Sequence, residues 1–279
     1  MGGTQMKFML ITNSPDSAKY AEDCGVARIF IDLEVNGKKE RQGHLDTLIS
    51  QHSIKDISLV KRSIKKAELL VRLNPLHKQT QSEVDQVIEL GADLVMLPMF
   101  KTADELRLFS TMVGGRAGII PLVETYSALK DMNNIVDVTG LSEIYIGLND
   151  LHLDMGLSFM FEPLANGLID IATDIIKRAN LPFGFGGIAR VGEGDIPGEL
   201  VLAEHVRLGS NSVILSRSFH KSGSELISLR QNTDLEAEID KLFLTLKSLK
   251  LRDLKQTESD RKVLVKKVLK VVEFKNQII

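Results

Sequence analysis

Four short apolar segments of the sequence end in charged or polar residues. The endings are Asp32-Leu33-Glu34, Arg72-Leu73-Asn74, Glu124-Thr125 and Asn149-Asp150. Such side chains are costly to remove from water unless they are paired or coordinate a ligand. If the four segments are strands of one sheet, their endings converge on one rim. That convergence would indicate a binding or catalytic site more strongly than any single ending does.

Glu124 and Asp150 are the two carboxylates of this set that could share a cation. Neighbouring strands lie ~5 Å apart, so side chains at adjacent strand ends can reach one ion. Mg²⁺ takes one or two protein carboxylates, retains several waters and leaves its other positions to substrate oxygens. The alternative is that Glu124 caps the following helix and Asp150 caps a turn. We expect both residues to be metal ligands.

Arg72 ends an apolar segment, 69–71. A buried arginine is rare unless it is paired, and its planar guanidinium matches a substrate carboxylate or enolate. The alternative is an internal salt bridge with Glu34 or Glu124, which would not exclude substrate binding. We expect Arg72 to be a catalytic and substrate-binding residue.

Two further segments could contribute to the same rim. Asn149 precedes Asp150, and the glycine-rich segment 184–187 belongs to another apolar run. Many barrels bind phosphate after their last two strands, so residues 184–187 and 217–218 are candidates for that role. The alternative is that the glycines only permit a tight turn or a close approach of the backbone. We expect Asn149 and Gly186 to contact the substrate.

Histidines are the candidates for proton transfer. His44 lies in a long polar segment, 35–53, from which an imidazole could reach over the site as a general base. The alternative is a surface histidine without a catalytic role, and the same two interpretations apply to His152, which follows Asp150 closely. The other histidines have no supporting context in the sequence: His52, His77, His205 and His220.

The apolar segments alternate regularly with helical patterns. Eight runs without polar alternation lie at about residues 8–11, 28–32, 69–73, 94–98, 119–123, 144–147, 183–186 and 212–215. Such runs are typical of strands that are buried on both faces of a parallel sheet. Eight strand–helix alternations favour an α/β fold of the (β/α)8 TIM barrel type. An open sheet usually begins with a glycine-rich dinucleotide turn, and residues 12–16 contain no glycine.

The composition is that of a globular protein and excludes several classes. The 279 residues are 43% hydrophobic with a net charge of −2, which argues against a collagen-like, disordered or nucleic-acid-binding chain. Cys24 is the single cysteine, which excludes an internal disulfide and a cysteine-based metal cluster. No apolar run reaches the ~18 residues of a membrane helix, and residues 1–12 lack the pattern of a signal peptide. We therefore expect a cytoplasmic protein without a transmembrane segment.

The C-terminal part differs in charge from the rest of the chain. Residues 250–279 contain nine Lys or Arg and four Asp or Glu, a net charge of +5, which leaves −7 for the remainder. Apolar stripes at helical spacing run through 226–249 and 263–272, although a barrel needs only one closing helix. We predict a barrel domain at 1–225 and a helical extension at 226–279 that mediates homo-oligomer formation. The alternatives are an anionic membrane or nucleic-acid contact and a solvated tail.

The strand-end motifs, taken as an ordered set, resemble one known family. The chain contains Ile31-Asp32-Leu33-Glu34, Val71-Arg72-Leu73-Asn74, Val123-Glu124-Thr125 and Ile146-Gly147-Leu148-Asn149-Asp150-Leu151. Their order and spacing are similar to those of the HpcH/HpaI aldolase and citrate lyase β-subunit family, part of the phosphoenolpyruvate/pyruvate barrel superfamily. The resemblance extends from about Lys7 to Phe219.

The resemblance implies a role for each matching residue. Glu124 and Asp150 look like the two Mg²⁺ or Mn²⁺ ligands, and Arg72 looks like the arginine that holds the keto or enolate oxygen. Asp32 and Glu34 look like the acidic pair that hydrogen-bonds metal-bound water or this arginine. Together they imply a metal-dependent carbon–carbon lyase that forms or consumes a pyruvate-like enolate from a small 2-oxo or hydroxy acid or an acyl-CoA. A cation and an arginine stabilise the negative charge of such an enolate as it develops.

The sequence also departs from the family pattern. Aldolase members carry a histidine directly after the acidic pair and a glutamine before the metal-binding glutamate, where this chain has Val35 and Val123. His44 comes ten residues after the acidic pair, and Lys39 and Arg41 are similar to basic residues of citrate-lyase-like members. The resemblance therefore assigns the metal ligands of this chain, but it assigns neither its general base nor its substrate. The alternatives to a lyase are a non-catalytic metabolite-binding barrel that acts through its tail and a phosphate-binding barrel enzyme.

Overall fold

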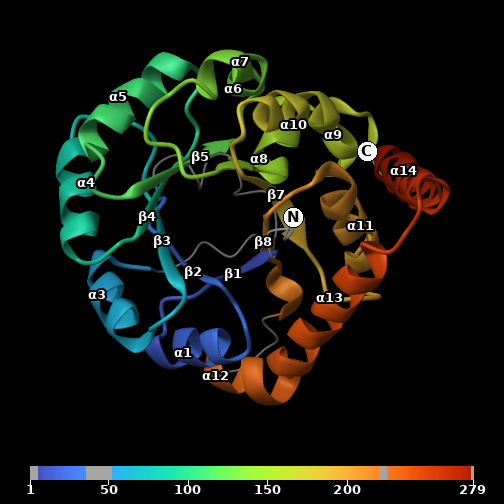
Figure 1. Ribbon diagram of the computed structural model, residues 1–279, viewed down its shortest axis with the longest axis horizontal. Coiled ribbons are helices and arrows are strands. Elements are labelled where there is room, and N and C mark those ends of the chain that lie inside the picture. The colour runs from blue at the N-terminus through green and yellow to red at the C-terminus, as the bar shows by residue number, and fades with distance from the viewer. Residues whose placement is uncertain (1–5, 36–51, 220–224, 278–279) are drawn as a thin grey trace.

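The structure of the protein is a computed structural model that describes residues 6–35, 52–219 and 225–277. Eight parallel strands form a closed barrel in sequence order, because β1 pairs with both β2 and β8 (Figure 1). The strands are β1 Lys7–Ile11, β2 Arg28–Asp32, β3 Glu68–Arg72, β4 Leu94–Leu97, β5 Gly118–Val123, β6 Ile144–Ile146, β7 Phe183–Ile188 and β8 Ser212–Leu215. The predicted α/β barrel is confirmed.

Helices surround the barrel and cover the outer faces of its strands. They follow the strands as α1 Pro15–Asp23, α3 Ile54–Ser63, α4 Thr80–Glu89, α5 Ala103–Val113, α6 Tyr126–Lys130, α7 Met132–Ile135, α8 Leu148–Asp154, α9 Glu162–Ala165, α10 Leu168–Arg178 and α11 Gly198–Leu208. The short elements η1 Arg217–Phe219, α12 Glu225–Ile227 and η2 Ser228–Thr233 then lead to the last two helices. None of the described helices is both long and apolar enough to cross a membrane.

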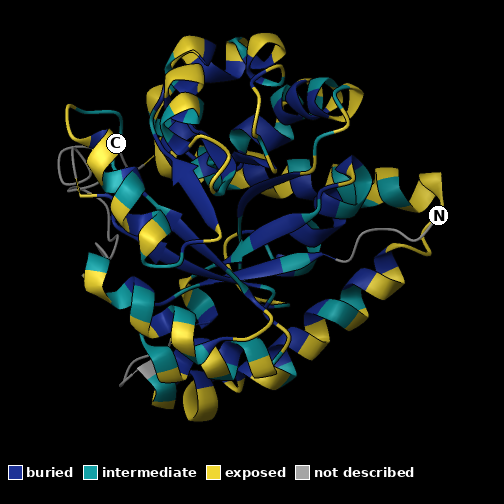
Figure 2. Ribbon diagram, turned by 60° about the vertical axis from the view of Figure 1, so that its left-hand side comes forward, coloured by how far each residue is buried: buried dark blue, intermediate teal, exposed yellow. Residues whose placement is uncertain are grey.

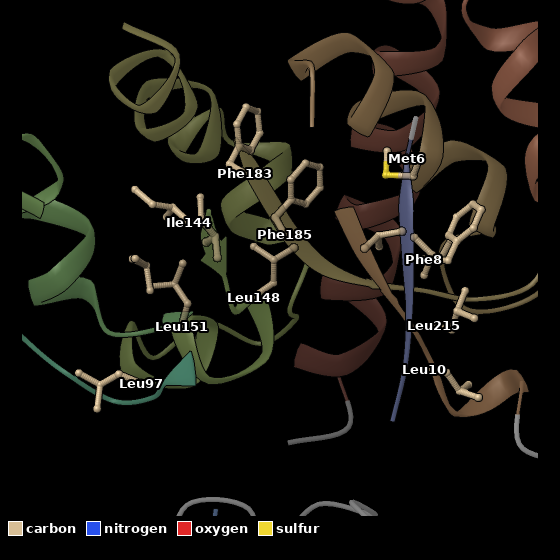
Figure 3. Close-up of a cluster of buried hydrophobic side chains, with 14 of the residues drawn as sticks. Met6, Phe8, Leu10, Leu97, Ile144, Leu148, Leu151, Phe183, Phe185 and Leu215 are labelled. Atoms are coloured by element: carbon tan, nitrogen blue, oxygen red, sulfur yellow. The ribbon is translucent and has the colours of Figure 1, made fainter. Parts of the chain in front are cut away.

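The strands are buried on both faces, whereas the helices expose their outer faces (Figure 2). The cluster inside the barrel consists of Met9, Phe30, Leu70, Leu94, Met96, Ile120, Leu122 and Tyr145. A larger cluster fills the space between the strands and the helices, and Figure 3 shows Phe185 of β7 beside Leu148 of α8. Burial on both faces explains why the strand sequences do not alternate between apolar and polar residues.

Two long helices, α13 Leu235–Leu249 and α14 Leu254–Asn276, form the C-terminal part. α13 closes the chain's own barrel, because the ring of Phe243 meets that of Phe8 in β1 edge to face at 5.0 Å between centroids. α14 lies outside α11 and α9 and buries Val268 (Figure 1). Both apolar stripes predicted from the sequence therefore contact the chain that carries them. The homo-oligomer and the division into two domains stay predictions.

Candidate active site at the carboxyl ends of the strands

Arg72 ends β3 directly beside Asp32, which ends β2, because the two residues are partners in the strand register. The guanidinium donates from Nε to Asp32 Oδ1 and from Nη2 to Asp32 Oδ2, both at 2.9 Å. Its Nη1 lies 3.3 Å from Glu34 Oε2. An internal salt bridge of Arg72 with Glu34 is therefore present. It holds the guanidinium in one orientation at the rim of the barrel.

These three charged side chains are nearly removed from solvent. The exposed fraction is 13% for Arg72 and 2% for both Asp32 and Glu34. Burial by itself would lower the pKa of the Arg72 guanidinium, but the charges of Asp32 and Glu34 outweigh burial and raise that pKa above its ordinary value. Arg72 is therefore a permanent cation at this position.

Glu124 follows β5 and is buried, and its carboxylate is held by a backbone amide. Glu124 Oε1 accepts a hydrogen bond of 3.0 Å from the Met99 N–H. Burial raises the pKa of the Glu124 carboxyl well above its ordinary value, and the charge of Asp150 raises it further, while Arg72 acts in the opposite direction. Two carboxylates that repel each other in this way favour a cation between them.

Glu124 does not cap the following helix. The N-cap of α6 is Thr125, whose hydroxyl accepts a hydrogen bond of 3.1 Å from the Ala128 N–H. The Glu124 carboxylate instead lies against Gly147, where an added Cβ would come within 3.0 Å of Glu124 Oε2. Gly147 thus leaves room for this carboxylate. It is also the N-cap residue of α8, which places Asp150 in the first turn of that helix.

The Met99 amide that holds Glu124 belongs to an unusual backbone conformation. Met99 has a φ of 56°, in the left-handed region that side chains with a Cβ rarely adopt. Its neighbour is fixed as well, since Thr125 Oγ1 donates to Phe100 O at 2.9 Å. Strained residues of this kind cluster at functional sites, where the surrounding structure maintains them. No pattern in the sequence pointed to Met99.

A cavity of about 210 Å³ opens between the strand ends. Its polar wall contains Arg72, Glu124, Asn149 and Asp150, and its apolar wall contains Phe30, Met96, Leu122, Tyr145, Leu148, Met160 and Ile214. Gly147, Gly186 and Gly187 complete the lining. The structure therefore brings Arg72, Glu124, Asn149, Asp150 and Gly186 to one cavity, which has room for a small molecule.

The glycine-rich segment 184–187 lies within β7. A Cβ at Gly184 would come within 2.6 Å of the Tyr145 ring, so this glycine serves close packing inside the barrel. Gly186 has a φ of 55°, which favours glycine, and it is the residue of the segment that reaches the cavity together with Gly187. The next helix, α11, begins only at Gly198, so its N-terminus does not directly follow the glycines. The phosphate-binding interpretation therefore has no support in this geometry.

Two described histidines bear on the predicted proton transfer. His44 lies outside the described residues. His52, which has no supporting context in the sequence, accepts a hydrogen bond at Nδ1 from the Asp32 N–H at 3.0 Å. His152 is buried and does not line the cavity, and burial lowers its pKa. The sequence could not indicate His52, because its contact is with Asp32, 20 positions earlier in the chain.

The side chains of the cavity suit a hard divalent cation. No group of three or more His, Cys, Asp or Glu side chains within the described part of the chain is arranged to hold a metal ion. The cavity does offer the carboxylates of Glu124 and Asp150. Two carboxylates match the protein ligands of Mg²⁺, which keeps several waters and binds substrate oxygens. The donor set fits such an ion.

The fold and the cavity define a (β/α)8 barrel with an acidic site at the carboxyl ends of its strands. A model of the HpcH/HpaI aldolase/citrate lyase family matches residues 6–164. The chain belongs to this family, and the resemblance inferred from the strand-end motifs is confirmed. No curated protein matches the chain.

Solved structures show the same fold at low sequence identity. An HpcH/HpaI aldolase from Desulfitobacterium hafniense DCB-2 has a TM-score of 0.61 at 16% identity, over 86% of this chain and 93% of that one. A family member from Burkholderia cenocepacia J2315 has a TM-score of 0.60 at 14% identity, over 88% and 95%. The citrate lyase beta subunit of Mycobacterium tuberculosis, complexed with oxaloacetate and magnesium, has a TM-score of 0.61 at 12% identity, over 89% and 98%.

Proposed function

We propose that this protein is a divalent-metal-dependent carbon–carbon lyase of the aldolase type. It forms or consumes a pyruvate-like enolate from a small 2-oxo or hydroxy acid or from an acyl-CoA. The observation that carries the proposal is that Glu124 and Asp150 line the same cavity as Arg72. Membership of the aldolase and citrate lyase family supports the reaction class. The relative with bound oxaloacetate and magnesium supports the cofactor.

Glu124 and Asp150 are the residues that would hold Mg²⁺ or Mn²⁺. The bound cation supplies positive charge that stabilises the enolate as it forms. The Met99 N–H fixes Glu124 Oε1, and Gly147 leaves space beside Oε2. The chain thus orients this carboxylate before a cation binds, which favours metal affinity.

Arg72 would hold the keto oxygen of the substrate and the enolate oxygen that develops from it. A guanidinium has five N–H groups; the hydrogen bonds with Asp32 occupy two of them, and Nη1 forms an ion pair with Glu34. The N–H groups that make no hydrogen bond to the described residues would be available to a ligand in the cavity that Arg72 lines. Asp32 and Glu34 act as positioning residues for Arg72. Asn149 and Gly186 would contact the remainder of the substrate.

The reaction requires a base near the hydroxyl group of the carbon that leaves. In the cleavage of a 4-hydroxy-2-oxo acid, the base takes the hydroxyl proton and the C3–C4 bond breaks. C4 leaves as an aldehyde, and the electron pair of the broken bond becomes the enolate, which is then protonated at C3. We propose His44 for this role on the sequence evidence given above.

Metal-dependent product release tests the proposal. The metal-free protein would be assayed with Mg²⁺ or Mn²⁺ on a panel of 4-hydroxy-2-oxo acids and hydroxyacyl-CoA compounds. We expect activity that a chelator removes and that Glu124→Gln or Asp150→Asn lowers by about 10³-fold, the scale for losing transition-state charge stabilisation. Glu89→Gln, an identical change on the exposed surface of α4, is the matched control. Activity that survives both the chelator and the two site variants would contradict the metal assignment.

We also propose a cytoplasmic homo-oligomer with the C-terminal helices at its interface. Leu244, Leu269 and Phe274 on α13 and α14 are each more than half exposed, at 67%, 55% and 65%. Exposed apolar residues on these two consecutive helices support a protein contact. The molar mass in solution of the chain truncated after Leu249 tests this proposal, and an unchanged oligomer would contradict it.

A further inference from the structure

The C-terminal end of α14 contacts the connection between α8 and α9, which borders the candidate active site. Ser158 Oγ donates to Asn276 Oδ1 at 2.8 Å. Lys275 Nζ donates to Ser158 O at 3.4 Å and lies 5.0 Å from the centroid of the Phe159 ring. These contacts join residues that are 117 and 118 positions apart in the sequence.

The contacted residues are directly connected to the wall of the cavity. Met160 follows Phe159 and lines the cavity. The N–H groups of Ser158 and Phe159 both donate to Glu162 Oε1, at 2.8 and 2.7 Å. The rings of Phe159 and Phe161 meet edge to face at 5.5 Å between centroids. A displacement of Ser158 or Phe159 therefore displaces Met160.

α14 is anchored strongly enough to serve as a fixed point for this segment. Arg261 Nη1 lies 2.6 Å from the buried carboxylate of Glu204 in α11, and its Nη2 donates to Ala165 O in α9 at 3.3 Å. Val268, about two turns further along α14, is fully buried. The helix is thus held to α11 and α9 before it reaches Ser158.

The start of the connection is held to α8 by backbone hydrogen bonds, from Gly156 N–H to Leu153 O at 3.0 Å and from Leu157 N–H to His152 O at 2.8 Å. Gly156 has a φ of 67°, and no described atom lies within 4 Å of the position that a Cβ would take there. The barrel itself does not require α14, because α13 already covers the first strand through Phe243 and Phe8. The contacts of Lys275 and Asn276 therefore have a task other than closure of the barrel.

We propose that Lys275 and Asn276 are positioning residues for the candidate active site. Through Ser158 and Phe159 they hold Met160 as part of the apolar wall of the cavity. The inference rests on the proposed function only for the identity of the ligand. It assigns to the end of the C-terminal extension a role in shaping the substrate pocket of its own chain.

The role of Met160 determines which kinetic constant should change. Met160 supplies apolar surface to the cavity and no charge, so its displacement weakens binding of the substrate and leaves the chemical step intact. The contacts made by Lys275 and Asn276 lie at the surface, where a cation–π contact or a hydrogen bond contributes little. We therefore expect KM to rise by about 3- to 10-fold with kcat changed less than about 2-fold.

The test compares the double variant Lys275→Ala/Asn276→Ala with Lys270→Ala, an exposed lysine of α14 that contacts none of these residues. Lys275→Arg keeps the cation and a donor and should behave as the wild type. The chain has no tryptophan, so Met160→Trp introduces a fluorescent reporter into the cavity wall. Each α14 variant is measured for KM and kcat, for hydrogen exchange of residues 155–161, and for fluorescence emission in the Met160→Trp background.

We expect the double variant to exchange faster at 155–161, to red-shift the emission and to raise KM, while Lys270→Ala changes none of them. Unchanged exchange and emission would overturn the inference, and so would a shift in both without any change in KM. If the wild type lacks metal-dependent turnover, the proposed function fails. Binding of pyruvate with Mg²⁺, measured by calorimetry, then replaces KM, and if pyruvate does not bind, the emission and exchange alone decide whether α14 holds the wall.

Discussion

Each end of the barrel holds a buried arginine among carboxylates, and the two clusters differ in charge balance. At the amino ends of the strands, Arg28 Nη2 lies 2.9 Å from Glu68 Oε2 and Nη1 lies 3.2 Å from Glu143 Oε2. Lys7 also contacts Glu68, at 2.9 Å, and the Ser212 hydroxyl donates to Glu143. Two cations and two carboxylates meet in this cluster, so their charges balance.

At the carboxyl ends of the strands an arginine also meets carboxyl groups, but in a different ratio. The five side chains Asp32, Glu34, Arg72, Glu124 and Asp150 comprise one guanidinium and four carboxyl groups. Three of them line a cavity. A buried arginine therefore does not by itself mark an active site. The candidate active site differs from the other cluster in its excess of carboxyl groups and in the cavity that they border.

The largest effect is expected from breaking the balanced cluster. Arg28→Met leaves the Glu143 carboxylate, with an exposed fraction of 4%, buried without its cation. We expect the free energy of unfolding to fall by about 3–5 kcal/mol, the usual cost of removing one partner of a buried ion pair. Urea denaturation measures this loss.

The affinity of the folded Arg28→Met protein for Mg²⁺ should stay at the wild-type value, because the substitution lies at the opposite end of the barrel. Glu143→Gln, which removes the charge but keeps an acceptor, gives a second measurement if the first variant does not fold. A loss below about 1 kcal/mol in both variants would show that this cluster does not stabilise the barrel.

The corresponding change at the other end should affect catalysis instead. Arg72→Lys keeps the positive charge but loses the paired hydrogen bonds to Asp32, whose two distances are 2.9 Å. We expect kcat/KM to fall by about 10²-fold, the scale for losing one donor to a developing oxyanion. Steady-state kinetics on the active substrate measure the effect. An unchanged kcat/KM would assign Arg72 to a structural salt bridge, equivalent to that of Arg28.

A smaller effect concerns His205, which lies near the amino ends of the strands. Its ring stacks on Phe185 at 3.8 Å between centroids, its Nδ1 lies 2.8 Å from Ser210 Oγ, and its Nε2 has no hydrogen-bond partner among the described residues. Burial lowers the pKa of His205 to about 3. The native state therefore binds the proton more weakly than the unfolded chain does.

It follows that stability is lost as the pH falls below about 6.5, the ordinary pKa of histidine, and that the loss continues towards about 3. The slope for one group approaches about 1.4 kcal/mol per pH unit, which gives about 2 kcal/mol between pH 6.5 and 5. His205→Gln should remove this contribution, as measured by urea denaturation at several pH values. Equal pH dependence in the variant and the wild type would contradict it.

The fold and much of the rim could be predicted from the sequence. Strands buried on both faces appear as continuous apolar runs, and the carboxyl ends of parallel strands must meet. Arg72, Glu124 and Asp150 could therefore be assigned to one cavity. The apolar stripes of α13 and α14 also indicated helices correctly.

Other parts depend on contacts between distant segments, which leave no local pattern. The left-handed backbone of Met99 and the contact of His52 with Asp32, 20 positions away, are two examples. An apolar stripe shows that a helix is buried on one side but not which surface it covers. The sequence therefore could not indicate that Phe243 of α13 packs on Phe8 of its own barrel, and a homo-oligomer through these helices stays a prediction. The contact of Lys275 with Ser158 was equally inaccessible.

Calorimetric titration of the metal-free protein with Mg²⁺ and with Mn²⁺ tests the central claim most directly, because it needs no substrate. The account predicts one divalent-cation site per chain in the wild type and in Glu89→Gln. It predicts that Glu124→Gln and Asp150→Asn each weaken this site by more than about 100-fold, beyond the effect of removing a group that only supports a ligand. Wild-type protein that binds no cation, or site variants that bind with unchanged affinity, would contradict the account.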